Sequence, residues 1–269
     1  MFPLYTTSFP SSASDLKRLL TNSLKRILEV KGDPVSVREA SYPHLQEMRI
    51  LLDEARLRSN PPAPRAICDE VSPALQVDQL TLSALALSIG TADLDLSLRA
   101  SDVAFTQGKD IDDQVVLALE DAADGKVEIK ITQRSLVALV TELLQAQAKK
   151  QGITLDAVKL ELDQESSRSV AVRVCLQIKK LFLNASLVVV GHLELDDHLN
   201  LRISRLICTG DGGIANVACG ILNPYLRRID GREFSLLSLP IGEMQLRDLQ
   251  LEVGENITVT ADFGSGKRA

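Results

Sequence analysis

The sequence predicts an α+β protein in which antiparallel strands pack against a few long amphipathic helices. After about residue 75, apolar residues alternate with polar ones along several segments, which is typical of half-buried antiparallel strands. Two segments, at 132–152 and at about 213–228, instead repeat apolar residues at helical spacing. Because several strands lie between these helices in the sequence, few β-α-β crossovers can form, and a parallel sheet is not expected.

Composition narrows the functional classes. The chain has 269 residues, 45% apolar and 25% charged, which is typical of a globular protein with one large or two small domains. The net charge is −6, aromatic residues make up 3%, and Trp is absent. Nucleic-acid binding normally uses a basic face and stacking rings, so we expect no nucleic-acid partner. Nothing in the sequence fixes the oligomeric state.

The first helix is expected at 14–29, with Ser14 as its N-cap. Its apolar residues follow the spacing of an amphipathic helix. Its other face is basic and carries Lys17, Arg18, Lys25 and Arg26. Packing of the apolar stripe on the protein itself is the favoured interpretation. The alternative is that residues 16–28 lie on an anionic membrane surface.

A second helix is expected from His44 to about Arg58, before the NPPAP sequence at 60–64. Five apolar residues share one side of this helix: Leu45, Met48, Leu51, Leu52 and Ala55. The sequence therefore predicts two domains. Residues 1–60 form an N-terminal helical segment, packed on or appended to a main domain of residues 61–269.

The main domain is expected to begin with strands between residues 75 and 131. A helix at 132–152 follows, with Thr132 as a cap. Four more strands are expected, then a helix from Gly213 to Arg228 and a hairpin turned near Gly254. The four strands are expected at 155–163, 168–179, 181–195 and 199–208.

The cysteines and the N-terminus bear on the cellular compartment. Cys68, Cys175, Cys208 and Cys219 are widely spaced, so buried free thiols are predicted, with a disulfide among them left open. The first residues lack the basic and apolar regions of a secretory signal. We therefore expect a reducing, cytoplasmic location, with peripheral membrane association as an alternative.

A glycine-rich turn is one candidate site. GDGGIA at 210–215 fits the dinucleotide-binding spacing G-x-G-x-x-A, and Asp230 lies where such folds place an acidic residue. The preceding strand, however, contains Arg202, Ser204 and Arg205, which indicates a half-exposed antiparallel strand. A simple turn into a helix is the favoured interpretation. A nucleotide-dependent enzyme is the weak alternative.

A polar cluster is the other candidate. His192, Glu194, Asp196 and His198 would share one face of a continuous strand, which is a composition suited to metals. Because Asp196 begins a natural hairpin tip and leucines occupy the alternate positions, a solvated polar face is favoured. The sequence also lacks the common hydrolase motifs. We therefore expect no catalytic residue, no metal, no cofactor and no enzymatic activity.

The two long helices carry aliphatic stripes that either fill a core or line an elongated groove for an acyl chain. The sequence around them resembles the bacterial DUF2993 family (LmeA-like phospholipid-binding proteins). The segment ITQRSLVALVTELLQAQAKKQGITLDAVKLEL resembles the family's long helix and the strand that follows it. Two later segments, LNPYLRRIDGREFSLLSLPIG and LRDLQLEVGENITVTADFG, resemble the family's closing helix, its LPLG signature and its last hairpin. With the earlier strands VDQLTLSALALSIGTADLDLSLRASDVAF, the likeness covers about residues 75–264.

The resemblance implies a TULIP-like roll, in which a strongly curved antiparallel sheet wraps around long amphipathic helices and encloses a hydrophobic cavity. It implies no catalytic residues. The cavity is expected to be lined by Leu136, Leu139, Val140, Leu143, Leu144, Ile214, Val217, Ile221, Tyr225, Leu239 and Ile241. The leading hypothesis is thus non-enzymatic binding of a lipid or another long apolar ligand, in a carrier or membrane-surface role. The alternative is a structural or protein-interaction module with a filled core.

Overall fold

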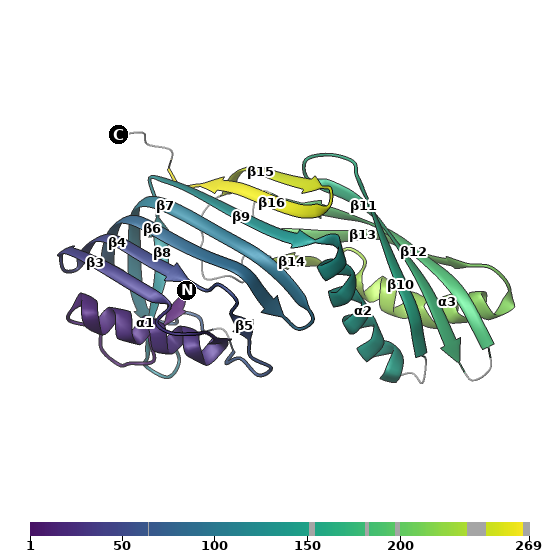
Figure 1. Ribbon diagram of the computed structural model, residues 1–269, viewed down its shortest axis with the longest axis horizontal. Coiled ribbons are helices and arrows are strands. Elements are labelled where there is room, and N and C mark those ends of the chain that lie inside the picture. The colour runs from purple at the N-terminus through teal and green to yellow at the C-terminus, as the bar shows by residue number, and fades with distance from the viewer. Residues whose placement is uncertain (64, 151–153, 181–182, 197–199, 236–245, 266–269) are drawn as a thin grey trace. The chain divides into compact units, whose positions relative to one another are not determined.

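The computed structural model describes residues 1–63, 65–150, 154–180, 183–196, 200–235 and 246–265 (Figure 1). The chain divides into two compact units. The first unit lies mainly within residues 1–130, and the second mainly within residues 131–236. The last two strands are shared, because residues 250–258 belong to the second unit and their neighbours on either side to the first.

The first unit contains one described helix and most of the short strands. Residues 1–60, expected as a helical segment, lie in this unit and form mostly strands. The elements are β1 (Phe2–Pro3), α1 (Ala13–Ile27), β2 (Leu28–Glu29), β3 (Val35–Ser41), β4 (His44–Leu51), β5 (Arg56–Leu57), β6 (Ser72–Ile89), β7 (Ala92–Lys109), β8 (Val115–Asp121) and β9 (Asp124–Thr132).

The second unit contains two long helices and a meander of strands, as the sequence predicts. The last two strands, β15 and β16, follow it in the chain. The elements are α2 (Gln133–Lys150), β10 (Thr154–Gln164), β11 (Ser169–Lys180), β12 (Leu183–Leu195), β13 (Asn200–Gly210), α3 (Gly213–Ile229), β14 (Glu233–Ser235), β15 (Leu246–Val253) and β16 (Asn256–Phe263).

The described strands form two mainly antiparallel sheets. The larger sheet has the order β15-β16-β9-β7-β6-β4-β3, with further short strands paired off this path. The smaller sheet has the order β10-β11-β12-β13-β14 and is antiparallel throughout its described pairs. Two parallel pairs, β4 with β6 and β5 with β6, occur in the larger sheet. The predicted α+β class is confirmed, and the pairing orders leave both sheets open.

Helix α1 packs its apolar stripe on the first unit, as favoured from the sequence. Leu16, Leu20 and Leu24 are at most 7% exposed, and the helix contacts β1, β2 and β3. The cap is Ser12 rather than Ser14, and its hydroxyl oxygen accepts a hydrogen bond from the Asp15 N–H. The apolar stripe is therefore used inside the protein, while Arg18 and Arg26 remain exposed.

The helix expected from His44 to Arg58 is wrong, because His44–Leu51 is strand β4. Gln46 has no partner in β3, since Glu39 pairs with Leu45 and Arg38 with Glu47. This irregularity places buried residues three apart instead of two, which imitates helical spacing. The neighbouring strands β6 and β7 have the same three-residue spacing between buried residues. The paired rows are Leu45–Val77–Val103 and Met48–Leu80–Ala100.

No helix among the described residues is long and apolar enough to cross a membrane.

Candidate functional site

The helix-bearing face of the β10–β14 sheet holds the candidate site. Strand register fixes which side chains share this face, because alternate residues of each strand point to the same side. Four rows of paired residues run across the strands on this face. The rows are Val158–Leu176–Leu187, Leu160–Val174–Val189–Cys208, Leu162–Val172–Gly191 and Gln164–Val170–Leu193–Ile203.

One end of this face is a closed core under the two helices. Leu155, Leu176 and Leu187 form a buried cluster with residues of α3, and Leu144 of α2 packs against it. The other end is also closed, since Val170 and Leu195 are 3% and 4% exposed. There the β10–β11 turn is held by backbone hydrogen bonds, such as that from the Leu251 N–H to the Ser167 carbonyl oxygen at 2.6 Å.

Between these closed ends lies a band of half-buried aliphatic side chains. We call it the apolar strip, and it consists of Leu160, Leu162, Val172, Val174, Val189 and Leu206. Val174 and Val189, at one edge of the strip, also pack against the closed core. Gly191 lies within it, and a Cβ atom there would come within 2.7 Å of the Leu206 side chain. Leu206 therefore occupies the space above this glycine. The strip contains no charged side chain, so nothing in it offers a partner to a polar ligand.

Helix α2 carries five of the eleven side chains predicted from the sequence. Leu136, Leu139, Val140 and Leu144 are all half-buried, and Leu144 contacts the closed core. The side chain of Leu143 lies outside the described residues. The predicted cap is present, because the Thr132 hydroxyl oxygen accepts a hydrogen bond from the Ser135 N–H at 3.0 Å.

Helix α3 packs with a different face from the one expected to line a cavity or seal a core. Its buried residues are Ala215, Ala218 and Cys219, with Leu222 against them. Val217 and Tyr225, expected in the stripe, are instead 66% and 43% exposed. The side chains of Ile214 and Ile221, and all of Leu239 and Ile241, lie outside the described residues.

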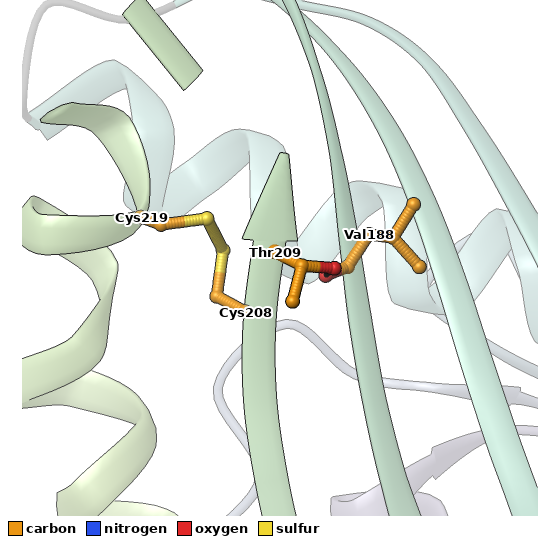
Figure 2. Close-up of a disulfide and its surroundings, with 4 residues drawn as sticks. All are labelled: Val188, Cys208, Thr209 and Cys219. Carbon is orange, nitrogen blue, oxygen red and sulfur yellow. Dashed lines mark hydrogen bonds between the residues drawn. A yellow bond between two sulfur atoms is a disulfide. The ribbon is translucent and has the colours of Figure 1, made fainter. Parts of the chain in front are cut away.

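A disulfide between Cys208 and Cys219 sets the rotation of α3 (Figure 2). The two Cα atoms are 5.5 Å apart, so Cys219 must face strand β13. Neighbouring Thr209 points to the opposite side of the sheet, as residues alternate along a strand. The prediction of free thiols is therefore wrong for this pair. Cys175 is a half-buried free cysteine, and Cys68 is free but exposed rather than buried.

The glycine-rich turn joins β13 to α3, as favoured from the sequence. Gly212 is the N-cap of the helix and has φ of 87°, a conformation that glycine adopts without strain. A Cβ atom on Gly210 would lie 2.6 Å from that of Ala215, so the turn is tight. Strand β13 is antiparallel to both of its neighbours, whereas a dinucleotide-binding turn follows a parallel strand.

The polar candidates do not converge on one point. His192 Nδ1 lies 3.0 Å from Glu165 Oε2, while Glu194 and Asp196 are exposed. His198 lies outside the described residues. Among the described part of the chain, no three His, Cys, Asp or Glu residues are placed to hold a metal ion.

Comparisons with protein-family models, curated proteins and solved structures give no match for the chain. The likeness to the DUF2993 family thus stays an expectation based on the sequence. The residues that sequence reasoning missed are the strand side chains of the apolar strip and the small residues of α3. The alternation within β10 to β13 points to the former, and the spacing of Cys208 and Cys219 around a turn points to the latter.

Proposed function

We propose that the second unit binds a lipid or another long apolar ligand on the apolar strip, without catalysing a reaction. One observation carries this proposal: aliphatic side chains stay half-buried between two closed ends of the same sheet face. Burial of apolar surface stabilises by about 25 cal/mol per Å² and has no directional requirement, which suits an acyl chain. An aliphatic band without charges favours such a ligand over a polar metabolite.

The resemblance to the DUF2993 family supports the same assignment. The resemblance implies a TULIP-like roll in which a curved sheet and a long helix enclose the ligand, and we assign these two parts to β10–β13 and α2. We therefore assign Leu136, Leu139 and Val140 to the ligand-contacting side of α2. Val217 and Tyr225, being exposed on α3, are assigned a separate role below.

We also revise the expected location. Disulfides persist in oxidising compartments and are rare in the cytosol. The Cys208–Cys219 bond therefore favours an oxidising compartment over the cytoplasmic location expected from the N-terminus.

A matched pair of substitutions tests the binding site. Val172 lies on the strip, apart from the residues packed against the closed core, and half-buried Val190 lies on the opposite face of the sheet. A Val→Thr change keeps the shape and adds a hydroxyl, so Val172→Thr should weaken binding of a fluorescent fatty acid about tenfold. Val190→Thr should leave the affinity unchanged. Titration by fluorescence in vesicle-free buffer measures both, and native mass spectrometry of gently purified protein should detect a bound lipid.

Equal affinities for the two variants would remove the strip from the proposal. Failure of the wild-type protein to bind the fatty acid, together with no lipid in the mass spectrum, would favour the alternative of a structural or interaction module.

A further inference from the structure

Helix α3 exposes several large apolar side chains among those that the structure describes. Val217, Tyr225 and Ile229 are 66%, 43% and 37% exposed, while Ala215 is fully buried. Val217, Pro224 and Tyr225 border one flank of the helix, since eight residues make little more than two turns, and Ile229 is the last residue of the helix. The helix is attached to its sheet by Ala215, Ala218 and Leu222 and by the disulfide, on a different side from Val217.

The charges of the helix indicate which kind of partner surface could cover this flank. Residues 213–229 contain no Asp or Glu, and Arg227 and Arg228 lie in the last turn. The Arg228 guanidinium lies 5.9 Å from the centre of the Tyr225 ring, so a cation borders the apolar flank directly. Of the acidic residues next to the helix ends, Asp230 accepts a hydrogen bond from the Leu206 N–H of β13.

We propose that this flank of α3 docks on a membrane that carries anionic headgroups. The proposal rests on the proposed function, because a lipid-binding unit must meet the membrane from which its ligand comes. Aliphatic side chains enter the boundary between headgroups and acyl chains, and a tyrosine ring suits that depth. Arginine side chains extend to the phosphates and add attraction to an anionic surface.

The disulfide has a defined part in this docking. The noncovalent packing of α3 on the sheet comes from alanines and Leu222 among the described side chains. The Cys208–Cys219 bond fixes the helix to β13 and keeps Val217 and Tyr225 outward.

The absence of tryptophan from the chain allows a direct test. Single tryptophans are introduced by Tyr225→Trp and Val217→Trp on the flank, and by Asn216→Trp as a control on the exposed polar side of α3. Each variant is mixed with phosphatidylcholine vesicles with and without phosphatidylglycerol, and with brominated acyl chains as quenchers. Emission of both flank tryptophans should shift to shorter wavelength and be quenched on the anionic vesicles, and emission of the control should not.

The charge requirement is tested by Arg227→Gln with Arg228→Gln in the Tyr225→Trp background. Partitioning onto the anionic vesicles should fall by about tenfold or more, and added salt should reproduce the loss. Quenching that is equal at Asn216→Trp and Tyr225→Trp, or absent at all three positions, would overturn the proposal. A concentration-dependent shift without vesicles would also overturn it, in favour of a second copy of the chain.

Failure here is separable from failure of the proposed function. Val217→Asp should abolish vesicle binding and leave fatty-acid binding in vesicle-free buffer at the wild-type level. Loss of both activities in a folded variant would show that Val217 serves the ligand site instead.

Discussion

Helices α1 and α3 have similar amphipathic sequences but pack in opposite ways. Helix α1 buries its large residues, with Leu16 and Leu20 at 0% and 1% exposure. Among its described side chains, helix α3 buries alanines and a cystine, packs Leu222 against them, and exposes Val217 at 66%. An apolar stripe therefore shows only that a helix has a side that avoids water. Whether that side meets its own sheet or an external surface depends on what the sheet offers.

The sheets of the two units also differ in how fully their apolar side chains are buried. In the first unit, five consecutive residues of β8, Val115 to Leu119, are buried, so both faces of that strand are covered. In the second unit, the residues of the apolar strip are only half-buried. Strand β8 of the first unit is thus closed on both faces, whereas the apolar strip of the second unit is only partly covered.

The largest expected effect on the free energy of unfolding comes from a Leu→Ala substitution, made once in each unit. Leu16→Ala should cost about 4 kcal/mol of unfolding free energy, because it leaves a cavity in a closed core. Leu160→Ala in the apolar strip should cost about 1 kcal/mol, because a half-buried side chain loses fewer contacts. Chemical denaturation followed by circular dichroism, with amide hydrogen exchange assigned to each unit, measures both.

Similar costs for the two changes would remove the distinction between a closed and an open unit. A cost at Leu160 as large as that at Leu16 would mean that the strip is part of a filled core.

The next largest effect concerns the attachment of α3. In the chain-entropy model, a disulfide that spans 11 residues stabilises by about 3 kcal/mol. Replacing Cys208 and Cys219 together by Ser should therefore raise amide hydrogen exchange throughout α3 and leave α1 unchanged. Cys175→Ser, which alters a free cysteine of the same sheet, is the matched control. Unchanged exchange in the double variant would show that the small packed residues hold α3 without the bond.

Much of the fold follows from local patterns in the sequence. Alternation along β10 to β13 and the stripe of α2 are strong because each is repeated over many residues. Strand β4 was predicted as a helix because the register shift at Gln46 places Leu45 and Met48 on the same side of the strand. A shift of this kind arises from pairing with other strands, so the local sequence does not contain it.

The sequence located part of the candidate site and misplaced another part. Leu136, Leu139 and Val140 of α2 were expected to face a ligand, and they are half-buried. For α3, the stripe with the largest side chains was predicted to be buried, because large apolar side chains gain the most free energy from burial. The actual face is set by the Cys208–Cys219 bond, which the four cysteines of the sequence leave as one of several possible pairings.

The smallest expected effect is a pH dependence confined to the first unit. Asp110 is 5% exposed, and its carboxylate pairs with the Arg65 guanidinium. Its other oxygen accepts hydrogen bonds from the Asp112 and Gln114 N–H groups, both at 2.9 Å. Burial raises the pKa of Asp110, but Arg65 and these N–H groups outweigh it and hold the pKa below the ordinary value of 3.8.

Because the folded state lowers this pKa, the stabilising contribution is present above the ordinary value and is lost as the pH falls through the folded pKa. Amide exchange in the first unit should therefore rise below about pH 4, and Asp110→Asn should reduce the steepness of that rise. Asp113→Asn is the control, because its partner Lys109 is exposed to solvent and the pair is worth little. An unchanged slope in Asp110→Asn would show that the buried pair does not set the acid limit of the closed unit.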